Sequence, residues 1–89
     1  MSNLLESDMF KNKNSGKNNL CGEKIRALRL AYPEKLSQRA LADKMQLIGI
    51  DIDKNAIQRI ESGQRFVTDI ELRALSEIFG ISADKLLQP

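Results

Sequence analysis

Three polar side chains lie close together near the middle of the chain, in a segment whose apolar residues recur at helical spacing. Ile57 and Ile60 fall on one side of such a helix, and Lys54, Asn55 and Gln58 fall on the faces left free. Asparagine and glutamine carboxamides pair bidentately with adenine, and a lysine ammonium reaches the acceptor atoms of guanine. Taken alone, each of these polar residues is common at the start of a helix. The ordered set predicts base contacts from one helix in the DNA major groove.

Four further residues are candidates for contacts with the DNA backbone. Phosphates are bound by cations, simple donors and helix N-termini. Gln38 lies in the first turn of the preceding helical pattern, where it could contact a phosphate or brace a recognition side chain. Arg59 lies on the recognition segment itself, and Gln64 and Arg65 follow it. The alternatives are that Gln38 is merely exposed and that Arg59 pairs with Glu61 or Asp43.

The hydrophobic pattern predicts that five helices position these side chains. They are expected over about residues 20–31 and 37–46, between Asp53 and Gly63, between Thr68 and Gly80, and after Ser82. Serine and aspartate are natural N-caps, and the T-x-x-E sequence at 68–71 is a capping box. Proline ends the first helix, and glycines end the third and fourth. Five helices with short connections predict a compact all-α domain.

The connection between the second and third predicted helices is long. It runs from Gln46 to Ile52 and carries four large aliphatic residues, Leu47, Ile48, Ile50 and Ile52. We expect some of them to pack into the core. A β-strand is the alternative, but no partner strand is evident.

The first 19 residues differ in composition from the rest. Residues 11–19 read KNKNSGKNN and contain no hydrophobic residue, which predicts a flexible tail over residues 1–19 and a domain over 20–89. An arm that follows DNA phosphates through Lys11, Lys13 and Lys17 is the functional alternative. The apolar residues between Leu4 and Phe10 could form one helical turn or contact a partner.

Composition excludes several classes of function. The chain has 89 residues, one cysteine and no histidine, so we expect no internal disulfide, no metal site and no cofactor. No nucleophile has an evident base, and no glycine-rich phosphate loop is present, so we expect no enzymatic activity. Cations outnumber anions over residues 21–65 and anions outnumber cations after that, a weak basic footprint on the suspected DNA-reading part. No signal peptide or membrane span is evident, and we expect a cytoplasmic protein.

Four segments resemble the lambda-repressor/Cro-like helix-turn-helix domains, also called the XRE family. They read GEKIRALR, LSQRALADKM, NAIQRIESGQR and TDIELRALSEIFGISADKLL, and together they span most of the chain. The resemblance implies a five-helix fold that binds operator DNA, usually as a dimer. By position, Gln38 matches a glutamine that touches the DNA backbone, and Lys54, Asn55 and Gln58 match base-facing positions. Gln64 and Arg65 match a loop that often contacts phosphates. The long Gln46–Ile52 connection departs from the family's shorter turn.

Two functions are therefore expected in order. The first is a sequence-specific bacterial or phage transcriptional regulator, a repressor in our interpretation, that binds double-stranded DNA as a homodimer. Any dimer is expected to use the last helix, through Leu86 and Leu87. The second is an antitoxin or adaptor that uses the same fold to bind a toxin or a phage protein.

Overall fold

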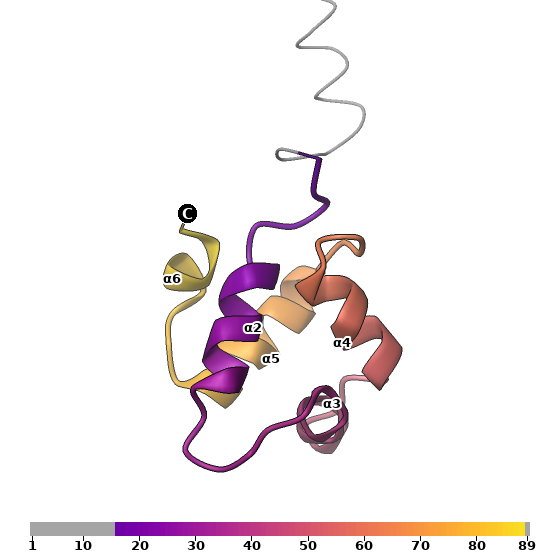
Figure 1. Cartoon of the computed structure of the whole chain (residues 1–89), viewed down its shortest axis with the longest axis vertical. Coiled ribbons are helices and arrows are strands. Elements are labelled where there is room, and N and C mark those ends of the chain that lie inside the picture. The colour runs from indigo at the N-terminus through magenta and orange to yellow at the C-terminus, as the bar shows by residue number, and fades with distance from the viewer. Residues whose placement is uncertain (1–15, 89) are drawn as a thin grey trace, which may run out of the picture.

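Five helices follow one another along residues 16–88, the part of the chain that this computed structural model describes. They are α2 (Gly22–Leu30), α3 (Gln38–Leu47), α4 (Lys54–Glu61), α5 (Asp69–Phe79) and α6 (Ala83–Leu87). Figure 1 looks along α3, while α4 runs across the view beside it. The predicted all-α fold of five helices is confirmed.

The predicted helix starts are formed by side-chain caps. Ser37, Asp53 and Ser82 each accept a hydrogen bond from the main-chain N–H three residues later, at 3.0, 2.8 and 3.2 Å. Thr68 and Glu71 form the complete capping box at the start of α5. These bonds satisfy N–H groups that have no partner within their own helix. Because each cap depends only on residues three positions apart, the sequence pattern was sufficient to predict them.

The core takes side chains from every helix. The largest residues with at most 1% exposure are aliphatic or sulfur-containing: Cys21, Ile25, Leu41, Met45, Ile57, Ile60, Leu75 and Leu86. α4 packs against both α3 and α2, and α6 packs against α5. The inward orientation predicted for Ile57 and Ile60 is confirmed, so the scaffold fixes which face of α4 points outward.

Leu86 is fully buried and belongs to this core. The sequence predicts that Leu86 and Leu87 together form a dimer contact, and for Leu86 this is wrong. The short helix α6 turns one of the two neighbouring leucines inward, and Leu87 stays 39% exposed.

The connection between α3 and α4 begins later than predicted, because α3 extends to Leu47. Within it, Ile52 is 3% exposed and packs into the core, whereas Leu47, now the last residue of α3, is 86% exposed. The Gln46 side chain donates a hydrogen bond of 2.8 Å to the Ile52 carbonyl oxygen, and the Ile50 N–H bonds the Met45 carbonyl oxygen at 3.0 Å. The extra residues are thus fastened back onto the end of α3.

The residues just before α2 are engaged with the rest of the domain. Asn18 and Asn19, which composition places in a flexible tail, donate hydrogen bonds to main-chain oxygens at the end of α4 and in the loop after it. Asn19 Oδ1 also accepts the Gly22 N–H at 2.8 Å, at the start of α2. The expectations for Leu4–Phe10, Lys11 and Lys13 fall on residues 1–15, outside the described part of the chain.

Candidate nucleic-acid interface

The outward face of α4 carries the predicted base-reading residues. Lys54, Asn55 and Gln58 are exposed, as is Arg59. All four lie within the first six residues of α4, whose N-terminal end lies beside α3 in Figure 1. The structure therefore brings the three residues together on one surface.

Arg59 has no ion pair within residues 16–88. The alternative that it pairs with Glu61 is wrong, because Glu61 lies on the buried side of α4 and is 7% exposed. Arg59 instead points outward from the last turn of α4 and keeps its guanidinium available for a ligand.

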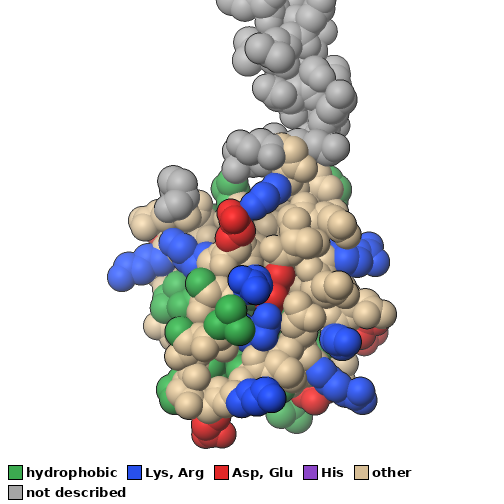
Figure 2. Space-filling model, in the orientation of Figure 1, with side chains coloured by type: hydrophobic (Ala, Val, Ile, Leu, Met, Phe, Trp, Pro, Cys, Tyr) green, Lys and Arg blue, Asp and Glu red, His purple; other side chains and the backbone are tan. Residues whose placement is uncertain are grey.

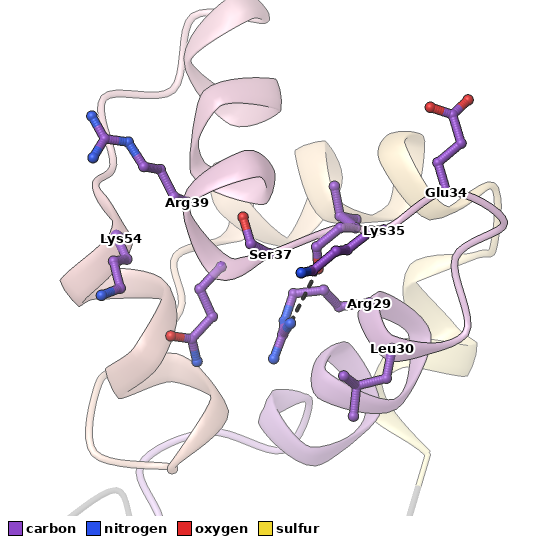
Figure 3. A pocket seen from close by; sticks show the side chains of 9 residues that line it. Arg29, Leu30, Glu34, Lys35, Ser37, Arg39 and Lys54 are labelled. Carbon is purple, nitrogen blue, oxygen red and sulfur yellow. Dashed lines mark hydrogen bonds between the residues drawn. The ribbon is translucent and has the colours of Figure 1, made fainter.

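A hollow of about 440 Å³ opens beside the N-terminus of α3. Its lining includes residues before and within the first turn of α3, together with parts of α2 and α4: Arg29, Leu30, Glu34, Lys35, Leu36, Ser37, Gln38, Arg39 and Lys54. Figure 3 shows Arg39 and Lys54 on one side of this hollow, and Arg29 and Leu30 on the other. The start of α3 and the start of α4 thus share one cationic rim.

Lys35 and Arg39 are exposed cations on this rim that sequence reasoning did not single out. The signal was present, because Lys35 lies two residues before the Ser37 cap and Arg39 lies in the first turn of the same helix. Figure 2 shows Lys and Arg side chains spread over the face formed by α2, α3 and α4, with acidic side chains between some of them. The basic surface is therefore dispersed across three helices.

Gln38 and Arg29 are tied to the same buried carboxylate. Arg29 Nε and Nη2 bind the two oxygens of Glu61 at 2.7 and 3.0 Å, and Gln38 Nε2 donates to Glu61 Oε1 at 3.1 Å. Arg29 Nη1 also donates to the Leu36 carbonyl oxygen at 3.1 Å. The hydrogen bonds with Glu61 raise the pKa of Arg29. This cluster joins α2, the start of α3 and the end of α4.

The cluster bears on both interpretations of Gln38. The bond to Glu61 holds the start of α3 against the end of α4, and because Glu61 is buried, this bond braces the packing of α4 and not a base-facing side chain. A carboxamide has two N–H donors and a carbonyl oxygen, so the bond to Glu61 uses only part of its capacity. A phosphate contact through the second N–H is compatible with this position.

Arg65 is engaged within the domain. Its two terminal nitrogens bind the Glu71 carboxylate at 2.8 and 2.9 Å, and Nη1 also donates to the Phe66 carbonyl oxygen. The hydrogen bond with Arg65 lowers the pKa of Glu71, which keeps the carboxylate charged. The guanidinium predicted to contact phosphate thus fastens the loop after α4 to the start of α5. Gln64, beside it, is exposed.

A comparison with protein-family models decides the class. The model of the helix-turn-helix family HTH_3 matches residues 25–86. The chain belongs to this helix-turn-helix family. Comparisons with curated proteins and with solved structures found no match.

In the terms of the helix-turn-helix family, α3 is the first helix of the motif and α4 is the recognition helix. The protein is a DNA-binding domain of the XRE, or lambda-repressor/Cro-like, type. Among residues 16–88 no helix is long and apolar enough to cross a bilayer.

Proposed function

We propose that this helix-turn-helix protein binds a specific operator in double-stranded DNA and represses transcription in a bacterium or phage. The observation that carries the proposal is the outward face of α4, where Lys54, Asn55 and Gln58 are exposed on a helix whose other side is fully packed. The major groove of DNA admits an α-helix, and the amide side chains on the exposed face of α4 can pair with adenine.

The residues around the outward face of α4 are proposed to contact the DNA backbone. Gln38, Arg59 and Gln64 are proposed to contact the DNA backbone, and the exposed cations Lys35 and Arg39 join them. Arg65 is proposed with them; its guanidinium also binds Glu71, so it would contact DNA from a position held against the start of α5. Phosphate contacts set position and salt dependence, whereas the residues on α4 set sequence preference.

The test is a selection of bound duplexes from a random library, followed by titration of the best site against unrelated DNA. We expect tight binding to one site and weak binding to the rest, near 10⁻⁴–10⁻⁶ M in order of magnitude at physiological salt. Asn55→Ala and Gln58→Ala should each weaken the selected site by about 1–3 kcal/mol and leave unrelated DNA almost unaffected.

Arg73→Ala is the matched control, because Arg73 is an exposed residue of α5 whose only ion pair in the described chain is with Glu77 on the same helix. It should leave both affinities unchanged. Equal, weak affinity of the unmodified protein for every duplex would overturn the proposal.

We further propose that the protein binds its operator as a homodimer in the cytoplasm. Leu20, Phe66 and Leu87 are 51%, 53% and 39% exposed and lie around one apolar hollow, next to Val67 and Leu72. A two-fold dimer would cover this patch and double the contacts that a single small module makes with DNA.

The antitoxin or adaptor interpretation rests in part on the Leu86–Leu87 end, where Leu86 belongs to the core and Leu87 remains exposed. Its other support, the segment between Leu4 and Phe10, is outside the described residues. A stoichiometric protein partner that copurifies, with no selected DNA site, would favour it over repression.

A further inference from the structure

The segment before α2 is hydrogen-bonded to the far end of the recognition helix. The bonds run from the Asn18 main-chain N–H to Gly63 O at 2.8 Å, from Asn18 Nδ2 to Gln64 O at 2.9 Å, and from Asn19 Nδ2 to Ile60 O and Arg65 O at 3.0 and 2.8 Å. We call Asn18 and Asn19 the asparagine clamp. It reaches across more than 40 positions of sequence.

The clamp supplies donors to main-chain oxygens at the end of α4 and in the loop after it; of these, Ile60 O also accepts the Gly63 N–H at 3.0 Å. The last carbonyl groups of an α-helix lack an intrahelical partner, and those of the loop that follows need one as well. Asn19 Nδ2 supplies one N–H to Ile60 O, in the last turn of α4, and the other to Arg65 O. Its Oδ1 accepts from Gly22, so one side chain ties the start of α2 to both.

Close packing supports the same contact. A Cβ atom at Gly22 would collide with the Ile60 carbonyl oxygen, so the start of α2 lies directly against the end of α4. The Lys17 side chain lies over Gly63, which has a positive φ of 84°, and Lys17 Nζ pairs with Glu23 at 2.9 Å. The segment from Lys17 to Asn19 is thus wedged between α2 and the turn after α4.

We infer that Asn19, assisted by Asn18, is a positioning residue that sets the end of α4 and the Gln64–Arg65 loop relative to α2. The inference rests on the proposed function, because a fixed orientation of α4 matters where the helix reads DNA. It also extends the DNA-reading unit to residues before the 25–86 match. Asn19 contributes more than Asn18, because its side chain makes three hydrogen bonds in the described residues and that of Asn18 makes one.

The first measurement needs no DNA. Amide hydrogen exchange of Gln64 and Arg65, whose N–H groups both bond Arg59 O, reports on the loop. We expect both amides to exchange several-fold faster in Asn19→Ala, relative to a core amide such as that of Leu75. Asn19→Asp keeps the acceptor for Gly22 and loses the two donors. Asn19→Asp should therefore also speed exchange of the Gln64 and Arg65 amides. Because it keeps the bond from the Gly22 N–H, it distinguishes the loss of the bonds to α4 and its loop from the loss of the bond at the start of α2.

The second measurement is the ratio of affinities for the selected operator and for unrelated DNA. Asn19→Ala loses three hydrogen bonds, two of them to the end of α4 and the loop after it, and should lower this ratio about tenfold. Ser76→Ala is the control, because it removes a 2.6 Å hydrogen bond to the Ile81 carbonyl oxygen, between the end of α5 and the loop after it. It should lower the melting temperature and leave the ratio within about twofold.

The outcomes separate the two proposals. If the unmodified protein binds every duplex with equal affinity, the proposed function fails. The positioning role then fails as well, even if Asn19→Ala speeds amide exchange in the loop. If the unmodified protein is specific but Asn19→Ala and Asn19→Asp keep both the ratio and the exchange rates, the clamp inference is overturned and the proposed function stands. If Asn19→Ala does not fold, Asn19→Asp and Asn18→Ala decide the question by the same two readouts.

Discussion

Glu61 is the side chain on which three helices meet. Its carboxylate binds Arg29 from α2 and Gln38 from α3, and its side chain is only 3% exposed. Breaking a buried ion pair by removing one partner leaves an uncompensated charge in a poorly hydrated site.

Glu61→Gln should therefore lower the free energy of unfolding by about 3–5 kcal/mol. Urea denaturation followed by circular dichroism measures it. Glu77→Gln removes the same charge from an exposed pair with Arg73 and should cost less than about 1 kcal/mol. Equal effects from the two substitutions would contradict the role given to Glu61.

Glu71 makes stability depend on acid pH. Its pKa lies below the ordinary value of 4.5, first because of the hydrogen bond with Arg65. A carboxyl group whose pKa is lower in the folded state stabilises the fold above 4.5, and this contribution is lost as the pH falls through the folded-state value.

We expect the urea midpoint to fall as the pH is lowered below 4.5, and Glu71→Gln to be less stable at neutral pH but to lose less on acidification. Midpoints measured across this range test the sign. A variant with the same pH profile as the unmodified protein would contradict it.

The residues that sequence reasoning missed share a physical cause. The Arg29–Glu61 bond joins positions 32 apart, and only the packing of α2 against α4 brings them together. The exposed face of α4, in contrast, follows from helical periodicity and was predictable. Composition assigns Asn18 and Asn19 to a flexible tail, because polar composition does not distinguish a solvated segment from one that binds main-chain oxygens.

At the scale of elements, α4 is fixed at both ends. Asp53 caps its start, and α2 and the asparagine clamp contact its end. The cap was predictable from local sequence, whereas the contact with α2 depends on tertiary packing. Similarly, the long α3–α4 connection was visible as a long apolar run, but which of its residues would be buried depended on how the loop folds back.

Gly22→Ala tests the contact between α2 and α4. The new methyl group would meet the Ile60 carbonyl oxygen, so one helix must shift. Overpacking of this kind should cost about 1–3 kcal/mol in the free energy of unfolding, although alanine is the better helix former. Thermal denaturation measures the loss. Glu23→Ala, at an exposed position in the same turn, should remain within about 0.5 kcal/mol, and a stabilised Gly22→Ala would contradict the close approach.

At the scale of the whole molecule, the last two leucines have different roles: Leu86 stabilises the fold, and Leu87 is proposed to contact a second copy of the protein. Leu86→Ala should lower the free energy of unfolding by about 2–5 kcal/mol, because Leu86 is fully buried. Leu87→Ser should keep most of the stability and weaken the proposed dimer. Sedimentation equilibrium with and without operator DNA measures association, and unfolding curves measure stability. A Leu87→Ser protein that associates as the unmodified one does would contradict the proposed dimer surface.

Cys21 is the one thiol of the chain, and it is 1% exposed between the asparagine clamp and α2. Burial raises the pKa of this thiol, so in the folded protein it is protonated and shielded from reagents. The rate at which a thiol reagent labels Cys21 therefore reports how often the segment before α2 opens. Comparing that rate with and without operator DNA would show whether DNA binding slows this opening.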